Sequence, residues 1–159
     1  MSASHQRVLF ICTGNYYRSR FAEAMFNHEA DKQGLEWSAF SRGLRIHLAP
    51  DEISPFTEQA LIERDIPRAC TAVEPRALHE PDLVSASLVI ALKQSEHLPM
   101  MLSDFPDWAA RISYWAVHDL DVETHDVALP QIEDLVNELI GNLRRGCAQG
   151  AESMAAMEF

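Results

Sequence analysis

The sequence predicts an α/β fold, a three-layer sandwich in which a four-stranded parallel sheet is flanked by helices. Two observations predict it. Short apolar segments alternate along the chain with segments whose apolar residues recur at helical spacing. The segment 87–92 is apolar at almost every position, as expected of a strand buried on both faces of a parallel sheet. Folds of this kind bind their ligands at the carboxyl ends of the strands.

The expected elements alternate between strand and helix. They cover residues 7–12, 18–30, 35–41, 54–64, 87–92, 95–102, 111–117 and 129–143, beginning with a strand. The strands are short apolar runs bounded by glycines or polar residues, and the helices repeat apolar residues at helical spacing. Gly34 separates the first helix from the second strand, and Gly43 ends that strand. Residues 67–81 follow neither period and predict an irregular segment.

Capping residues mark the ends of several helices. Ser54 and Pro55 predict a helix start, because serine accepts a backbone N–H and proline suits the first turn. Ser95 is expected to cap the following helix in the same way. Gly146 is expected to end the last helix. That helix carries an apolar stripe formed by Leu129, Ile132, Leu135, Val136, Leu139, Ile140 and Leu143.

Chain length and composition predict one domain over residues 1–159. The chain has 159 residues, of which 47% are hydrophobic, and this suits a compact domain of ordinary size. The core is expected over about 7–145, and residues 147–159 look like a tail. The longest apolar runs are too short to span a bilayer, and the polar first residues do not resemble a signal peptide.

Charge and cysteine usage exclude several classes of partner. The net charge is −11 and no basic tract is present, which argues against nucleic acid or a membrane surface as a partner. Cys12, Cys70 and Cys147 show no C-x-x-C spacing, so neither a disulfide framework nor a zinc site is expected. The histidines lack metal-ligand spacing, and His97 is expected to be solvated or half-buried like the others. We therefore expect a reducing, cytoplasmic setting and no metal or other cofactor.

The segment 8–19 carries the chemistry of the chain. A strand ends at Cys12 and a helix begins at Arg18, so a tight loop joins them. Backbone N–H groups of such a loop and of the helix N-terminus attract an oxyanion. Arg18 adds a planar fork that suits phosphate oxygens. In this field Cys12 is expected to be a thiolate, the nucleophilic form, and the segment predicts a phosphate-binding loop after the first strand.

This loop resembles that of the low-molecular-weight protein tyrosine phosphatases and the related thioredoxin-coupled arsenate reductases. Their motif is a cysteine, five residues and Arg-Ser, with Gly-Asn inside the loop and Ser-x-x-Ala-Glu continuing from it, here residues 19–23. The resemblance implies hydrolysis of phosphate monoesters, and protein phosphotyrosine above all, through a phosphocysteine on Cys12, with Arg18 as the clamp. A phosphorylated protein, a small aryl phosphate and phosphate or related oxyanions are the implied partners. The residues expected to bind the substrate are Thr13, Gly14, Asn15, Tyr16, Tyr17 and Ser19.

The resemblance also implies a general acid and a supporting serine. The family takes its acid from an Asp-Pro pair just after the fourth strand, and Asp119 falls at that spacing. Leu120 replaces the proline, and Asp121 is a second candidate two residues on. The stretch 41–43 resembles the family's Ser-Ala-Gly, which implies that Ser41 hydrogen-bonds Asn15. Arg42 occupies the alanine position, where it either adds a charge beside the site or points to solvent.

Departures from the family pattern leave two alternatives open. Tyr17 stands where many members have a second loop cysteine, and Arg20 where the phosphatases carry proline. An arsenate reductase needs resolving thiols, but residues 92–99, where the reductases place a cysteine pair, contain none. A non-catalytic phosphate-binding module is the other alternative, motivated by Arg20 and Leu120. Tyr16 is expected to line the pocket mouth and to stack on an aromatic substrate.

Overall fold

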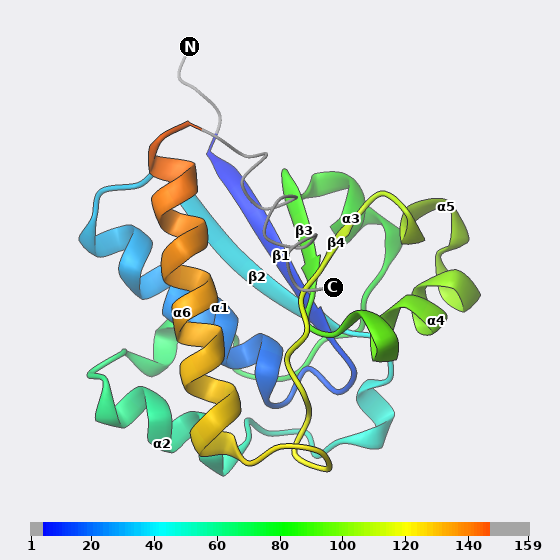
Figure 1. The fold of residues 1–159 in the computed structure, drawn as a ribbon, viewed down its shortest axis with the longest axis horizontal. Coiled ribbons are helices and arrows are strands. Elements are labelled where there is room, and N and C mark those ends of the chain that lie inside the picture. Colours follow the sequence, from blue (N-terminus) through cyan, green and yellow to red (C-terminus); the bar gives the residue numbers. More distant parts are fainter. Residues whose placement is uncertain (1–4, 147–159) are drawn as a thin grey trace.

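The computed structural model describes residues 5–146 and contains one parallel sheet with the strand order β2-β1-β3-β4. Helices lie on both sides of this sheet, which is the α/β sandwich that the sequence predicts (Figure 1). The predicted tail and Cys147 lie outside the described residues. The strands are β1 (Gln6–Cys12), β2 (Trp37–Gly43), β3 (Leu88–Ala91) and β4 (Ser113–Tyr114). The helices are α1 (Arg18–Lys32), α2 (Pro55–Glu63), α3 (Glu80–Ser85), α4 (Gln94–Asp104), α5 (Pro106–Ala109) and α6 (His125–Arg144), with short 3-10 turns at Ile46–Leu48 and Arg68–Cys70.

Strand β1 is the central strand and builds a core on each face. It pairs with β2 and β3, and Val8 through Ile11 are fully buried. Val8 and Phe10 join the side chains of α1, α2 and α6, whereas Leu9 and Ile11 join those of α3, α4 and α5. This alternation follows from the period of two in a strand, and a strand covered on both faces must be apolar throughout.

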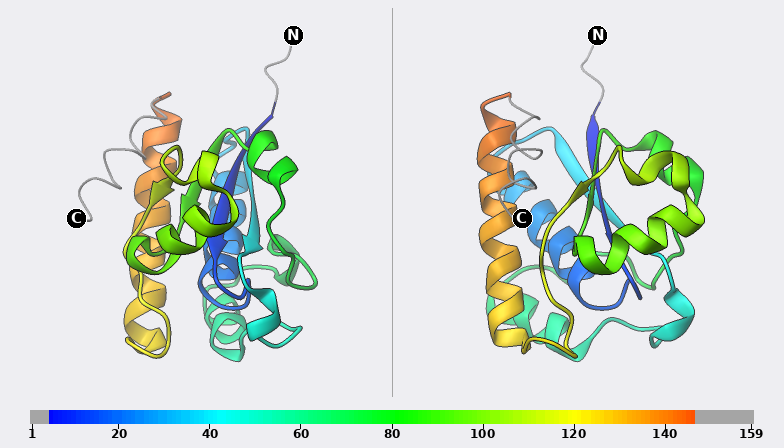
Figure 2. Two further views of the ribbon diagram at one scale, coloured as in Figure 1. Left: turned by 90° about the vertical axis from the view of Figure 1, so that its right-hand side faces the viewer. Right: turned by 45° about the vertical axis from the view of Figure 1, so that its right-hand side comes forward.

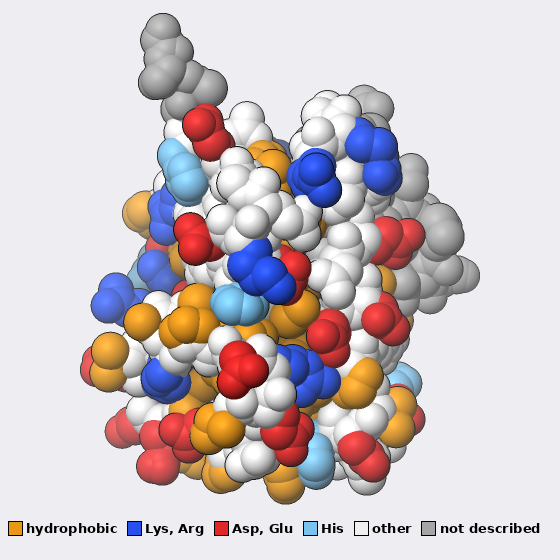
Figure 3. Space-filling view, turned by 90° about the vertical axis from the view of Figure 1, so that its left-hand side faces the viewer, with side chains coloured by type: hydrophobic (Ala, Val, Ile, Leu, Met, Phe, Trp, Pro, Cys, Tyr) orange, Lys and Arg blue, Asp and Glu red, His pale blue; other side chains and the backbone are white. Residues whose placement is uncertain are grey.

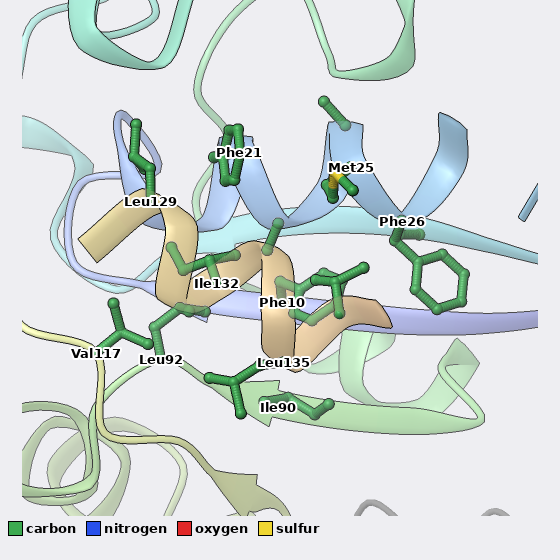
Figure 4. Close-up of a cluster of buried hydrophobic side chains, with 14 of the residues drawn as sticks. Phe10, Phe21, Met25, Phe26, Ile90, Leu92, Val117, Leu129, Ile132 and Leu135 are labelled. Carbon is green, nitrogen blue, oxygen red and sulfur yellow. The ribbon is translucent and has the colours of Figure 1, made fainter. Parts of the chain in front are cut away.

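The larger core lies between β1 and the helices α1 and α6. Phe21 and Met25 of α1 face Ile132 and Leu135 of α6 across Phe10 (Figure 4). All members of the predicted α6 stripe are buried, so the helical period in the sequence located this face correctly. α6 runs beside α1, and α4 lies beside α5 (Figure 2).

The structure corrects several element boundaries. Lys93 is the N-cap of α4, so Ser95 lies inside the first turn and does not cap the helix as predicted. The fourth strand keeps only Ser113–Tyr114 of the predicted 111–117, although Trp115 N and Val117 N still donate to backbone carbonyls beside β3. The short helices α3 and α5 were not predicted. Each has proline in its first turn, and single helical turns are too short to show a period.

The carboxyl ends of the strands gather at one end of the sheet. The loop after β1, the start of α4 and the segment before α6 meet there, at the lower end in Figure 1. At the same end, on the face that carries α2, hydrophobic side chains are interspersed with acidic ones (Figure 3). Phe56 and Ile62 of α2 are 43% and 63% exposed. None of the helices within residues 5–146 has the length and hydropathy of a membrane span.

Candidate active site

The loop between β1 and α1 holds Cys12 beside a hydroxyl group. Cys12 is 2% exposed, and its Sγ lies 2.9 Å from Ser19 Oγ. Asn15 Nδ2 donates to the same Ser19 Oγ at 2.9 Å. Because that bond uses an acceptor site of Ser19, the Ser19 proton is free to donate to sulfur.

Asn15 ties the loop to the sheet. Its φ of 53° lies in the left-handed region, which asparagine tolerates better than most residues. Asn15 Nδ2 donates to Ser41 Oγ at 2.9 Å, so the hydrogen bond expected between these two residues is present. Ser41 in turn donates to Glu23 Oε1 at 2.6 Å, and Arg76 N donates to Asn15 Oδ1 at 2.8 Å. Every polar group of the Asn15 side chain therefore has a partner that opposes rotation.

Arg20 braces the same loop from behind. It is fully buried and donates to Asn15 O at 3.2 Å, to Thr71 Oγ1 at 2.8 Å and to Ala72 O. Burial lowers the pKa of Arg20, although the nearby Glu23 charge acts in the opposite direction. The arginine at the family's proline position thus joins the loop to the segment after Arg68–Cys70.

Gly43 allows β2 to approach the loop closely. A Cβ atom on Gly43 would lie 2.9 Å from both Asn15 N and Thr13 O, so any side chain would push the loop away. Its neighbour Arg42 does not face the loop. Instead Arg42 Nε pairs with Asp82 Oδ2 at 3.2 Å. The structure therefore does not support the hypothesis that Arg42 adds a charge beside the site.

Arg18 is held from its outer edge by α4. It is 1% exposed, and its Nη1 and Nη2 donate to Glu96 Oε1 and Oε2 at 3.1 and 2.7 Å. Nη1 also donates to Val117 O at 2.9 Å. These bonds use the terminal nitrogens and leave the Nε–H edge for an oxyanion. Burial acts to lower the pKa of Arg18, but the hydrogen bond and charge of Glu96, with the charges of Cys12 and Asp119, outweigh it and raise that pKa.

Glu96 and His97 belong to this cluster, and the sequence analysis missed both. His97 is fully buried, which corrects the expectation that it is solvated or half-buried. Its Nδ1 accepts from Lys93 N at 3.0 Å, so the neutral ring carries its proton on Nε2, which lies 3.1 Å from Thr13 Oγ1 and 3.3 Å from Glu96 Oε2. The Thr13 hydroxyl also donates to Glu96. The feature of the sequence that could have identified Glu96 and His97 is their position, because both residues follow the carboxyl end of β3.

Opposing effects set the protonation of these two groups. Partial burial acts to raise the pKa of Glu96, but hydrogen bonds from His97, Arg18 and Thr13 and the charge of Arg18 hold it well below its usual range. Burial lowers the pKa of His97, while its contact with Glu96 acts in the opposite direction. The cluster therefore contains an ionised Glu96, a charged Arg18 and a neutral His97.

Asp119 approaches Arg18 from the segment before α6. Its Oδ2 lies 3.3 Å from Arg18 Nη2, and its Oδ1 accepts from Leu120 N at 2.9 Å. Asp119 and Asp121 both line a cavity of about 350 Å³ that also contains Cys12. Proline has no N–H, so the bond that holds Oδ1 exists because Leu120 replaces it. Of these two acids, it is Asp119 that pairs with Arg18.

The same cavity brings together four of the six residues predicted to bind the substrate, whereas Asn15 and Ser19 do not line it. Thr13, Gly14, Tyr16 and Tyr17 line it, together with Leu48, Ala49, Pro50 and Leu120. A second cavity, of about 460 Å³, is lined by Leu83, Trp108, Ile112 and neighbours on the opposite face of the sheet and contains none of the loop residues. Within residues 5–146, no three His, Cys, Asp or Glu side chains are arranged to hold a metal ion.

A comparison with protein families decides the membership of the chain. The family described as low molecular weight phosphotyrosine protein phosphatase matches residues 7–154. The chain belongs to this family. A solved low-molecular-weight protein tyrosine phosphatase from T. tengcongensis is 29% identical, with a TM-score of 0.71 over 86% of this chain and 99% of that one. A YwlE arginine phosphatase, in a cysteine-to-serine mutant with a phosphorylated active-site serine, is 25% identical with a TM-score of 0.73 over 87% and 96%.

A curated relative adds a second kind of substrate to the comparison. The protein-arginine-phosphatase of Bacillus subtilis (strain 168) is 34% identical over 99 residues, which is 62% of this chain. The aligned part spans 62% of the length of that relative. The proteins to which this chain is similar thus include some described as tyrosine phosphatases and some described as arginine phosphatases. The identity of the phosphorylated side chain does not follow from membership.

Proposed function

We propose that this protein is a cysteine-dependent phosphatase that hydrolyses phosphate monoesters through a phosphocysteine on Cys12. The observation that carries the proposal is the buried Cys12 Sγ, 2.9 Å from Ser19 Oγ, in a loop closed by the Arg18 guanidinium. A thiolate in this position attacks phosphorus in line with the leaving oxygen. The relative with a phosphorylated serine in its active site supports a phosphorylated enzyme as the intermediate.

Arg18 and the loop amides stabilise charge on the transferred phosphoryl group. The guanidinium presents its Nε–H edge to the equatorial oxygens, while Glu96 and Val117 O hold its other edge. Donors that are fixed before the reaction need no reorganisation as charge develops, and one such donor is worth about 10²–10³ in rate. The contacts with α4 therefore serve catalysis by fixing Arg18.

Asp119 serves as the general acid and then as the general base. As the phosphorus–oxygen bond breaks, the Asp119 proton passes to the leaving oxygen. In the second step the Asp119 carboxylate takes a proton from water, the water oxygen attacks phosphorus and the sulfur–phosphorus bond breaks. Inorganic phosphate and the Cys12 thiolate result, and Ser19 stabilises this thiolate as it leaves. A cytoplasmic location fits this cycle, because a reducing setting keeps Cys12 free.

Phosphotyrosine in a protein is the substrate that we propose first. The wall of the cavity near Cys12 includes Tyr16, Leu48, Pro50 and Leu120. These side chains supply apolar and aromatic surface for a phenyl ring above the phosphate. Leu48 is 68% exposed and Leu120 37%, so both lie at the mouth, where an aryl group enters.

Phosphoarginine in a protein is the second candidate. Asp119 and Asp121 line the same cavity, and their carboxylates suit a guanidinium group that carries the phosphate. The described activity of the Bacillus subtilis relative points to the same substrate. This candidate keeps Cys12 and Arg18 in the roles given above, but the substrate is then a phosphoramidate and not a phosphate monoester, because a guanidinium nitrogen replaces the phenol oxygen as the leaving atom.

Steady-state hydrolysis tests the function and the substrate. The wild-type protein is expected to hydrolyse p-nitrophenyl phosphate, and Cys12→Ser is expected to abolish turnover while it still binds vanadate. Residual turnover within about tenfold of wild type would overturn the role of Cys12. Matched peptides with phosphotyrosine or phosphoarginine at one position then separate the two candidates by kcat/KM. No turnover of any of these substrates by the wild type would overturn the phosphatase function.

A further inference from the structure

Tyr17 is a buried phenol in the loop itself. Its side chain is 3% exposed, and its hydroxyl finds no hydrogen-bond partner in the described part of the chain. Buried hydroxyl groups are normally paired, and an unpaired one costs free energy. Tyr114 shows the ordinary case, because its buried hydroxyl donates to Ala109 O at 2.6 Å. The unpaired hydroxyl of Tyr17 therefore calls for an explanation.

Tyr17 shares the active-site cavity with the proposed acid. Tyr17 is the N-cap of α1, and Thr57 Oγ1 donates to its carbonyl at 3.0 Å, which fixes the backbone. Tyr17 lines the same cavity as Asp119. Burial raises the pKa of Tyr17 to about 12, and among the charges that act on it Asp119 comes first, opposed by Arg18 and supported by Asp126. The phenol thus remains protonated and can donate a hydrogen bond within the cavity that Asp119 also lines.

Asp119 needs a new partner when it acts on a substrate. Its Oδ2 lies 3.3 Å from Arg18 Nη2. A phosphate group in the loop brings its own negative oxygens to Arg18 and repels the carboxylate from that contact. Asp119 must then turn toward the leaving oxygen, which lies on the far side of phosphorus from Cys12. The bond from Leu120 N then holds Oδ1 and leaves Oδ2 without the contact that it makes with Arg18.

We propose that Tyr17 is a positioning residue, whose hydroxyl donates a hydrogen bond to the Asp119 carboxyl group and holds it against the leaving oxygen. The inference rests on the proposed phosphatase function. One carboxyl oxygen exchanges the proton with the leaving group or with water, and the other accepts from Tyr17. The bond therefore serves both steps, and Tyr17 itself transfers no proton. Many family members have a second loop cysteine at this position. The cysteine side chain is too short to offer a donor with the reach of the tyrosine hydroxyl.

The test compares Tyr17→Phe with Tyr114→Phe, a matched control that removes a buried phenol hydroxyl away from the cavity. Two substrates are used: phenyl phosphate, whose poor leaving group needs the acid, and p-nitrophenyl phosphate, whose good leaving group needs it less. Tyr17→Phe is expected to lower kcat for phenyl phosphate by about tenfold or more, and that for p-nitrophenyl phosphate by less than about threefold. Tyr114→Phe is expected to change neither kcat. The melting temperature of Tyr17→Phe should not fall, because the lost hydroxyl is unpaired.

A double-mutant cycle separates positioning from a structural effect. In an Asp119→Asn background the same Tyr17→Phe change is expected to have no further effect, since the group it positions is gone. The inference would be overturned if Tyr17→Phe lowered kcat equally in the wild-type and the Asp119→Asn backgrounds. It would also be overturned if the kcat of Tyr17→Phe for phenyl phosphate stayed within about twofold of wild type. Either result would leave the phosphatase function intact. A wild-type protein without turnover of either aryl phosphate would instead overturn the proposed function, and the inference with it.

Discussion

Glu96→Gln should destabilise the protein by removing the anionic partner of a buried arginine. The Glu96 carboxylate accepts from Arg18 at 3.1 and 2.7 Å, from His97 Nε2 at 3.3 Å and from the Thr13 hydroxyl. Glutamine has nearly the same shape but one acceptor oxygen, and its amide N–H groups point at the donors of Arg18. The substitution therefore replaces the attraction between the Glu96 carboxylate and Arg18 with a contact in which two donor groups face each other without an acceptor.

The magnitude follows from the exposure of the two partners. Breaking a fully buried ion pair costs about 3–5 kcal/mol, and a hydrogen bond to a charged group is worth about 1.5–3 kcal/mol. The Arg18 side chain is 2% exposed but that of Glu96 is 22% exposed, so water screens part of the interaction. Val117 O and Asp119 also remain as partners of Arg18. We expect a loss of about 2–3 kcal/mol in the free energy of unfolding.

Urea unfolding at neutral pH measures this loss against a surface control. Glu63 pairs with Arg64 at 4.0 Å, and the Glu63 side chain is 61% exposed, so Glu63→Gln should cost no more than about 0.5 kcal/mol. An equal cost for the two substitutions would refute the reasoning, because it would mean that the contact with Arg18 contributes no more than a solvated pair.

The pH dependence of the same difference has a definite sign. The pKa of Glu96 is lowered in the folded protein, where hydrogen bonds and the charge of Arg18 outweigh partial burial. A lowered carboxyl pKa contributes stability that is complete above the unfolded value, about 4.3, and disappears as the pH falls through the folded value. The difference between wild type and Glu96→Gln should therefore be constant from pH 7 to about pH 5 and shrink only in stronger acid.

Further predictions concern turnover, acid sensitivity and arsenate. Arg18→Lys keeps the charge but loses the fork, so kcat/KM should fall by about 10² or more. Asp119→Asn should cost about 10²–10⁴ with poor leaving groups and remove the requirement for a protonated acid from the pH–rate profile, and the same signature in Asp121→Asn instead would move the acid two residues on. Burial lowers the pKa of His97, so the free energy of unfolding should fall as the pH drops below about 6.5, and His97→Gln should remove that part of the slope between pH 7 and pH 5.5. Arsenate should cause no oxidation of thioredoxin, because residues 92–99 contain no cysteine, and an arsenate-dependent disulfide found by mass spectrometry would contradict this.

The sequence predicted the sheet and the loop well because both depend on local patterns. β1 is apolar at every position of its buried part, and the α6 stripe repeats with the helical period, so each pattern has one structural solution. The loop residues lie within a few positions of one another, and a strand before them and a helix after them fix their arrangement. β4 was predicted too long, since a backbone can continue to donate to a neighbouring strand after the regular ladder ends.

The parts of the site that were missed depend on contacts between distant segments. Glu96 and Arg18 are 78 positions apart, and nothing in either neighbourhood states that a carboxylate meets the guanidinium. His97 resembles a surface histidine in sequence, but the packing of α4 against the loop buries it completely. The role of Arg20 could not be predicted for the same reason, because its partners Thr71 and Ala72 lie far along the chain, after the turn Arg68–Cys70. A local pattern predicts which chemistry a loop offers, whereas tertiary contacts decide how its groups are held and charged.

The two departures that motivate a non-catalytic reading have different physical consequences. Arg20 replaces a proline but points away from the cavity and spends its hydrogen bonds on the back of the loop, so it removes nothing that a phosphate group needs. Leu120 replaces the proline after the acid, and its N–H donates to Asp119 Oδ1 at 2.9 Å. The proline restricts this segment through its φ angle, whereas the leucine restricts the carboxylate through a hydrogen bond. The acid thus remains anchored near Arg18 by another route, and this favours a working phosphatase over a module that has lost its acid.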